Sequence, residues 1–237
     1  MCLKYLADIL SEISTWCTPY VPPEPEQTEV INGLLYNWFA VGDARNICAD
    51  GWHVPTEDNF ATLYSNISGT EVEKSEKVCD PSFTYWLSIG DSTNELKFNG
   101  RGSGARWFDT GEFTGLKGSL DLWTSTEVDG NNARCYYIVA GAQFNLGWTD
   151  KNDGKGIRLV KDSTTLTDGQ EGTYTGNDGK IYRTICIGTQ EWLADNLCET
   201  EFANGDSIPE VQVDGDWIAL ATAGMCAYNN NWLNVSL

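Results

Sequence analysis

The chain has 237 residues with 34 acidic and 15 basic side chains, so its formal net charge is −19 at pH 7. Such an acidic chain is a poor partner for phosphate backbones and anionic lipid, and nucleic acid is excluded as an expected ligand. Hydrophobic residues make up 41% of the chain and include ten tryptophans and ten tyrosines, so we predict a folded protein with a substantial core.

Histidine and cysteine usage argues against catalysis. The chain has one histidine, His53, which excludes any site that needs two imidazoles, such as the H-E-x-x-H zinc helix. Its eight cysteines never form a C-x-x-C pair, so neither a zinc knuckle nor a thioredoxin-type redox site is indicated. We therefore predict a protein that is not an enzyme and that needs no cofactor and no metal.

The first 17 residues are predicted to form an amphipathic helix. Leu3, Leu6, Leu10 and Ile13 follow the 3-4-3 spacing of one apolar helix face. A helix of this length is marginal alone in water, so we expect it to dock on another chain or to mediate oligomerisation. The start lacks the pattern of an export signal and no apolar run approaches 18 residues, so membrane insertion is not expected.

A proline-rich stretch over residues 18–32 is predicted to be an extended linker. The main part of the domain then covers residues 33–162. Thr56 is the expected N-cap of a helix that runs through Phe60 to Ile67. The expected strands cover residues 34–41, 134–139 and 156–160, and the glycine-rich residues 98–119 are expected to form ordered loops.

A C-terminal segment over residues 163–237 completes the organisation. Its first part, residues 162–173, is polar and is read as a connecting loop. Residues 173–175 and 180–187 then alternate in strand fashion around the turn Gly176–Gly179, which predicts a β-hairpin.

Three stretches resemble a known family. Residues 33–41 (GLLYNWFAV) and 51–55 (GWHVP) are similar to the LYNWYAV and GWHVP signatures of the Fibrobacter succinogenes major paralogous domain. Residues 178–197 (DGKIYRTICIGTQEWLADNL) resemble the opening block of that family, DGxxYxTVxIGxQxWMAENL. The family is related to the C-type-lectin-like fold, so the resemblance implies an α+β domain of that kind.

The order of these stretches is reversed relative to the family, where the DGxxY block comes first. The resemblance therefore implies either a circularly permuted domain closed within one chain or a domain completed by exchange with a neighbouring subunit. The family's closing strand often carries a cysteine, a plausible disulfide partner for the cysteine of the GWHVP block. Here that position is Leu159, which leaves Cys48 without that partner and favours free thiols.

A candidate ligand surface lies between residues 127 and 152, where polar and aromatic side chains alternate along a strand and its loops. Tyr, Trp and Asn suit recognition because they combine rigid contact area with adaptable hydrogen bonding. Ordinary solvent-facing strand residues are an equal alternative. The Glu-Pro-Asn and Gln-Pro-Asp tripeptides of calcium-dependent lectins are absent, so no metal is predicted. The candidate residues are Glu127, Asn131, Asn132, Arg134, Tyr136, Asn145, Trp148 and Asp150.

Together these features favour a non-enzymatic structural or decoration protein of a phage virion, assembled in the host cytoplasm. Its expected partners are other virion proteins or its own subunits, bound through residues 1–17, and a glycan or protein of the host surface. The alternative is a bacterial adhesion or ligand-binding protein located outside the cell or on its surface.

Overall fold

The computed structural model describes residues 32–235. The expected docking helix, with Leu3, Leu6, Leu10 and Ile13, lies outside the described residues, as does the linker apart from Asn32. Within residues 32–235, no helix combines the length and the apolar character needed to cross a bilayer.

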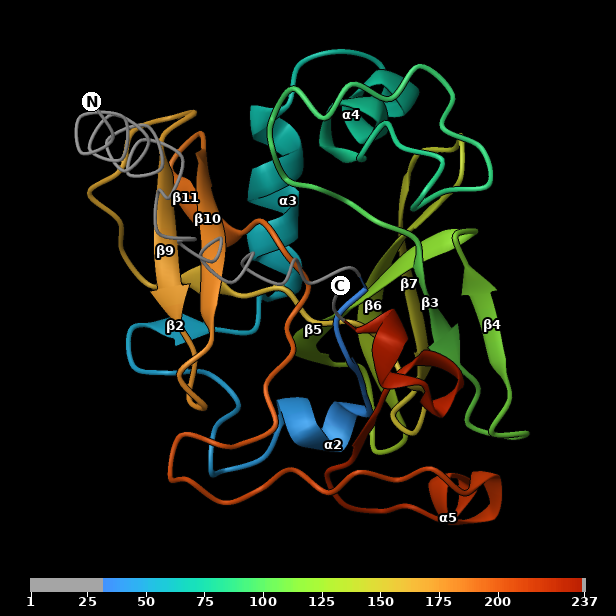
Figure 1. Cartoon of the computed structure of the whole chain (residues 1–237). Coiled ribbons are helices and arrows are strands. Elements are labelled where there is room, and N and C mark those ends of the chain that lie inside the picture. Colours follow the sequence, from blue (N-terminus) through green and yellow to red (C-terminus); the bar gives the residue numbers. More distant parts are fainter. Residues whose placement is uncertain (1–31, 236–237) are drawn as a thin grey trace, which may run out of the picture.

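The described chain is a mixed α+β structure built mainly from antiparallel strands (Figure 1). Its helices are α2 (Trp38–Val41), α3 (Glu57–Asn66), α4 (Glu71–Val78) and α5 (Asp214–Ile218), with 3-10 turns η1 (Tyr228–Asn230) and η2 (Trp232–Asn234). Its strands are β1 (Leu35–Tyr36), β2 (Trp52–His53), β3 (Ser103–Arg106), β4 (Phe113–Leu116), β5 (Ser119–Glu127), β6 (Asn132–Val139), β7 (Phe144–Asp150), β8 (Val160–Lys161), β9 (Glu171–Thr175), β10 (Ile181–Ile187), β11 (Gln190–Leu193) and β12 (Met225–Cys226).

One five-stranded sheet has the order β2-β8-β11-β10-β9. The predicted hairpin is confirmed, because β9 and β10 pair antiparallel around the turn that follows Thr175. Strand β11 continues from β10 and pairs with β8, with Trp192 opposite Val160. The C-terminal segment therefore forms three strands of a sheet whose other two strands come from the main part of the same chain.

The second five-stranded sheet has the order β4-β3-β5-β6-β7. The expectation of irregular loops over residues 98–119 was wrong, since β3 and β4 form an antiparallel pair there. Glycine is needed inside this pair: Gly104 has φ +66°, and a Cβ on it would lie 2.3 Å from the carbonyl oxygen of Thr114. Glycine at this position therefore lets the backbones of β3 and β4 approach closely, in a conformation that would be strained for other residues. The stretch forms strands for this reason.

Two other expected strands are shorter than predicted. The apolar run 34–41 divides at Asn37, whose side-chain oxygen accepts the Ala40 backbone N–H at 3.2 Å and begins helix α2. Residues 156–159 form no ladder; Gly156 instead donates to Asp121 of β5 before the chain reaches β8. Both errors arise because apolar sequence alone does not distinguish a strand from a buried crossing segment.

Helix α3 packs between the two large sheets. The predicted N-cap of this helix, Thr56, is confirmed. The Thr56 side chain accepts the Asn59 N–H, and the Asn59 side chain accepts the Thr56 N–H, which forms a capping box. On the buried face of α3, the ring of Phe60 stacks on Tyr136 of β6 at 4.4 Å and lies 5.0 Å from Trp192 of β11. Figure 1 shows α3 between the two sheets.

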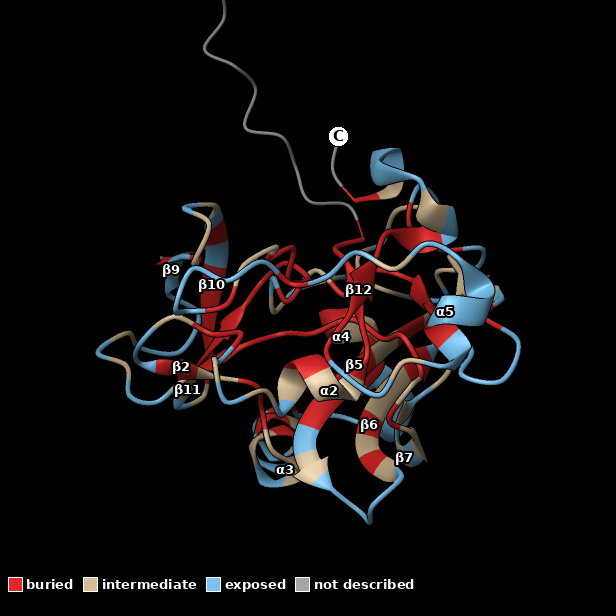
Figure 2. Cartoon of the chain, turned by 90° about the horizontal axis from the view of Figure 1, so that it is seen from below, coloured by how far each residue is buried: buried red, intermediate tan, exposed pale blue. Residues whose placement is uncertain are grey.

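The core runs through the centre of the molecule, where buried segments from both halves of the chain meet (Figure 2). Trp52, Trp123 and Trp192 are buried, whereas Trp38 is half-buried at the edge of the core. The six cysteines among residues 32–235 are all free and buried.

Candidate ligand-binding surface

The predicted ligand residues lie around the β6–β7 hairpin, and the strand register decides which of them share a face. Asn132 pairs with Asp150 and Arg134 with Trp148. Directly opposed residues of an antiparallel pair point to the same face. These four side chains therefore lie together, and Tyr136 follows two residues after Arg134 on that face.

Two predicted residues belong to the opposite face. Asn145 pairs with Tyr137, and Glu127, at the end of β5, pairs with Ala133. Tyr137 and Ala133 alternate with the residues of the first face, so Asn145 and Glu127 point away from Trp148. The predicted set is thus divided between two faces of the sheet.

Helix α3 covers part of the first face. Tyr136 stacks on Phe60, and Arg134 Nε lies 3.3 Å from a carboxylate oxygen of Glu57. Burial, followed by the nearby charge of Glu57, raises the pKa of the Tyr136 phenol. Tyr136 therefore acts mainly in packing, and Trp148, 62% exposed on edge strand β7, is the open centre of this face.

The turn between β5 and β6 is held by its own hydrogen bonds. The Asp129 carboxylate accepts the backbone N–H of Asn131 at 2.8 Å, the N–H of Asn132 at 2.9 Å and the Asn132 side-chain amide at 3.0 Å. The backbone bond from Asn131 is the largest influence that lowers the pKa of Asp129. These hydrogen bonds stabilise the turn, in which the Asn131 side chain is exposed.

Lys151 fastens this turn to the body of the domain. Its ammonium group pairs with Glu127, donates to the Gly130 carbonyl at 3.1 Å and lies 4.6 Å from the centre of the Trp38 ring. The Lys151 side chain is buried, so Glu127 is held by a fixed cation. Glu127 therefore helps to hold the turn in place, and its carboxylate is already paired with Lys151.

Sequence reasoning missed an exposed aromatic pair. Trp107 and Phe108 lie in the turn between β3 and β4 and are 41% and 38% exposed. The Phe108 N–H donates to the buried Asp153 carboxylate at 2.9 Å, which fixes the turn beside the end of β7. Adjacent aromatics in a glycine-rich stretch, read as a hairpin tip, are the signal that identifies this pair.

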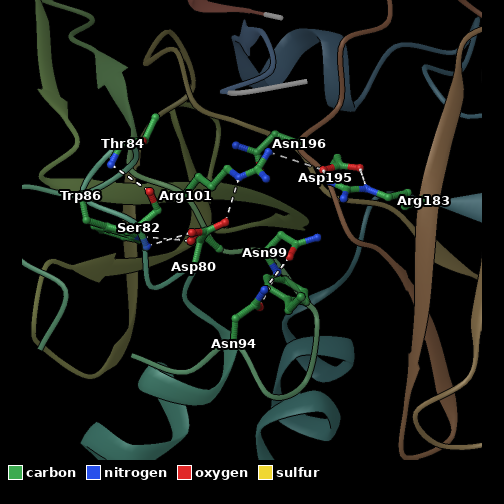
Figure 3. A network of polar contacts seen from close by, with 12 residues as sticks. Asp80, Ser82, Thr84, Trp86, Asn94, Asn99, Arg101, Arg183, Asp195 and Asn196 are labelled. Carbon is green, nitrogen blue, oxygen red and sulfur yellow. Dashed lines mark hydrogen bonds and ion pairs between the residues drawn. The ribbon is translucent and has the colours of Figure 1, made fainter. Parts of the chain in front are cut away.

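A network of charges ties the C-terminal segment to the main part of the domain (Figure 3). Asp195 accepts a hydrogen bond from Arg183 Nε at 2.9 Å and also lies 3.7 Å from Arg101 Nη1. Arg101 Nε in turn lies 3.5 Å from Asp80. Next to Asp195, the side-chain amide oxygen of Asn196 accepts a hydrogen bond from Nε of the buried Arg158 at 2.7 Å. Each group is engaged with an oppositely charged or polar neighbour, which gives the network a structural role.

The histidine and the cysteines, the side chains most suited to catalysis, are likewise held by partners or by burial. The Nδ1 atom of His53 lies 2.5 Å from Asp162, and its Nε2 atom lies 3.2 Å from the Asn59 side chain. Burial raises the pKa of both the Cys79 and the Cys198 thiols to about 12. These thiols are protonated near neutral pH and are poor nucleophiles.

A hollow lined by ionisable groups lies beside α4. It has a volume of about 320 Å³, and its acidic lining includes Glu73, Glu76 and Glu95, with Lys77 paired to Glu95 at 3.1 Å. No three His, Cys, Asp or Glu side chains in residues 32–235 converge as they do around a metal ion. This hollow is separate from the predicted ligand set, none of whose residues lines it.

The fold and this surface define an α+β domain whose polar and aromatic side chains are displayed around an edge hairpin. The chain belongs to the Fibrobacter succinogenes major domain family, whose model matches residues 7–171. The match contains the whole β6–β7 hairpin and ends at the start of β9. Neither a curated protein nor a solved structure matches the chain.

Proposed function

We propose that this protein is a non-enzymatic recognition component of a phage virion that contacts a host-surface glycan or protein. Its contact face comprises Trp148, Asn132, Asp150 and Arg134, together with the exposed Asn131 side chain in the adjoining turn. The observation that carries the proposal is Trp148, 62% exposed at the centre of a hydrogen-bonded edge hairpin. A rigid exposed aromatic residue supplies contact area at low entropic cost.

The chemistry of the described residues supports recognition over turnover. Catalysis by a nucleophile needs an activated thiol or hydroxyl beside a base. Cys79 and Cys198 are deactivated by burial, and His53 is engaged by Asp162. Polar side chains around Trp148, by contrast, remain at the surface and are suited to hydrogen bonding with a ligand.

We also propose that the domain is C-type-lectin-like and circularly permuted. The support is the pairing of β11 with β8 and the hydrogen bond from the Leu34 N–H to the Leu197 carbonyl at 2.9 Å, both within one chain. Exchange with a neighbouring subunit is the competing arrangement. Intramolecular closure predicts an unfolding midpoint that is independent of protein concentration, whereas exchange predicts a midpoint that rises with concentration.

The virion assignment rests on the sequence of residues 1–17. Leu3, Leu6, Leu10 and Ile13 are proposed to dock on other virion proteins or on further subunits. Co-purification of the full chain with phage particles, and its loss when Leu6 and Leu10 are both changed to Asp, tests this part. A bacterial surface adhesin is the alternative, and localisation on the bacterial envelope in the absence of phage would favour it.

The two faces of the hairpin offer a matched test of the contact surface. Asn131→Ala alters the exposed turn that adjoins the proposed contact face, whereas Asn145→Ala alters the opposite face of the β6–β7 hairpin. Binding to intact bacterial cells and to immobilised oligosaccharides is measured for both variants. We expect N131A to weaken binding several-fold and N145A to leave it unchanged. Equal effects of both changes, or no binding by the wild-type protein in either assay, contradict the proposal.

A further inference from the structure

Glu199 is a carboxylic acid sealed inside the junction between the two halves of the chain. Its side chain has no exposed surface. One carboxyl oxygen, Oε2, accepts the backbone N–H of Asp178 at 3.2 Å, and the Tyr182 hydroxyl also bonds the carboxyl group. The other oxygen, Oε1, has no hydrogen-bond partner within residues 32–235. An ionised carboxylate in this position leaves half of its charge unsatisfied.

The backbone is shaped to accept this carboxyl group. Gly176, which precedes the β9–β10 turn, faces Oε1 so closely that a Cβ at this position would lie 1.7 Å from it. Any other residue at 176 would displace the Glu199 side chain. The Glu199 carboxyl group therefore fits in the interior only because residue 176 is a glycine.

The groups that face Glu199 come from five other parts of the fold and from the adjacent Cys198. Asp178 and Lys180 belong to the β9–β10 turn, and the Tyr182 and Tyr174 phenols belong to β10 and β9. The Tyr36 phenol of β1 donates to the Glu199 backbone carbonyl at 2.8 Å. The thiols of Cys48, near β2, and of the adjacent Cys198 complete the surroundings.

Among these neighbours only Asp178 and Lys180 are charged at neutral pH, because burial raises the pKa of all three phenols and of both thiols. Lys180 pairs directly with Asp178. Glu199 is therefore left beside a carboxylate without a cation of its own. Burial, and then the charge of Asp178, raises the pKa of Glu199 to about 7.

We propose that Glu199 is a proton-controlled latch: its neutral form holds the β9–β10 turn against residues 197–201, and its ionisation loosens that junction. The contacts at stake are specific. Asp178 accepts from the Thr200 N–H at 3.3 Å, and Asn177 donates to the carbonyls of Ile47 at 3.0 Å and Glu201 at 3.1 Å. Loosening the junction therefore frees the turn from residues 200–201 and from Ile47 at the same time.

Amide hydrogen exchange of the full chain between pH 5.5 and 8 tests the latch. The reporters are the N–H groups of Asp178 and Thr200, which bond within the junction. We expect their protection factors to fall roughly 25-fold over this range in the wild-type protein, as the acid ionises. In Glu199→Gln, which cannot ionise, the fall should be absent.

The matched control is Glu171→Gln on the exposed part of β9, where the carboxylate pairs with Lys97 at the surface. This variant should keep the wild-type pH dependence. An equal fall in E199Q and wild type, or a matching loss of the fall in E171Q, overturns the proposal.

A second measurement does not depend on the variant folding. Infrared titration of the wild-type protein should reveal a protonated carboxyl band that persists at pH 6 and disappears above pH 8. Absence of that band at pH 6 overturns the proposal whatever the behaviour of E199Q.

Discussion

The β6–β7 hairpin and the junction around residues 195–201 use polar side chains in opposite ways. Beside the hairpin, in the β5–β6 turn, Asp129 accepts hydrogen bonds from the amides of its own turn, and Trp148 of the hairpin stays open to solvent. In the junction, Asp195 and Glu199 are buried and bind partners far away in sequence. Polar groups that hydrogen-bond within their own turn leave the nearby surface free for a ligand. Polar groups that bond to distant parts of the sequence hold the two halves of the chain together.

The largest difference between the regions should appear on removal of a buried charge partner. Asp195→Ala leaves Arg101, 5% exposed, with one fewer counter-charge in the interior. We expect the free energy of unfolding to fall by about 3 kcal/mol, because loss of one partner from a buried charge network is costly even though Asp80 remains beside Arg101. Urea denaturation measures this loss.

The surface pair of Asp206 with Arg45 is the control, since both side chains are largely solvated. Asp206→Ala should cost less than about 1 kcal/mol. Equal losses from D195A and D206A would show that the buried network does not hold the junction.

The pH dependence of global stability should come next in size. Glu199 has an ordinary pKa of 4.5 when unfolded and a pKa of about 7 when folded. Its folded pKa is raised, so the stabilising contribution is complete below pH 4.5 and is lost as pH rises through 7. The loss amounts to about 3 kcal/mol, and the urea midpoint measured from pH 5 to pH 8 should fall accordingly. A flat profile contradicts this.

Asp178 titrates in the opposite sense. Burial works to raise its pKa, but hydrogen bonds from the Lys180 side chain and backbone outweigh burial and hold the pKa below the ordinary 3.8. Its contribution is present above pH 3.8 and is lost as pH falls through the folded pKa. In Asp178→Asn the acid limb of the stability profile should therefore be shallower than in the wild-type protein.

A local cap should have an intermediate effect. Thr56→Ala removes the side-chain oxygen that accepts the Asn59 N–H at the start of α3. We expect a loss of about 1 kcal/mol, the usual value of an N-cap. Thermal unfolding measures it, and Thr56→Ser, which retains the oxygen, should recover most of the loss. An unchanged midpoint in T56A would show that α3 is held by Phe60 packing alone.

The hairpin should show the smallest effect on stability. Trp148 is mostly exposed and packs little, so Trp148→Ala should change the free energy of unfolding by no more than about 0.5 kcal/mol. Calorimetry of the variant checks this value. A loss comparable with that of D195A would place Trp148 in the structural framework and remove it from the proposed contact face.

Structural features that depend only on residues close together in the sequence could be predicted from it. The Thr56 cap and the Gly176–Gly179 turn are of this kind, and both are found in the structure. The division of the run 34–41 at Asn37 was not predictable, because the Asn37 side chain is fixed partly by Gly224, which donates to it from the other end of the chain. That contact exists only after folding.

The candidate site was predictable in composition but not in geometry. Sequence placed Asn145 and Trp148 in one set, although side chains three residues apart on one strand point to opposite faces. The register of β6 with β7 then decides which residues of β6 share the face of Trp148. Tyr136 is covered by Phe60 of α3, a contact that requires the helix to be docked. The exposure of Trp107 depends likewise on how β3 and β4 pair.

The central claim, that the hairpin recognises a ligand while the junction holds the fold, is tested most directly by one paired measurement on Trp148→Ala. Its affinity for intact bacterial cells and its unfolding midpoint are compared with those of the wild-type protein. The account predicts affinity at least about tenfold weaker, the effect of losing an aromatic contact residue, with an unchanged midpoint. Wild-type affinity in the variant, or weaker binding that only follows a lowered midpoint, would contradict it.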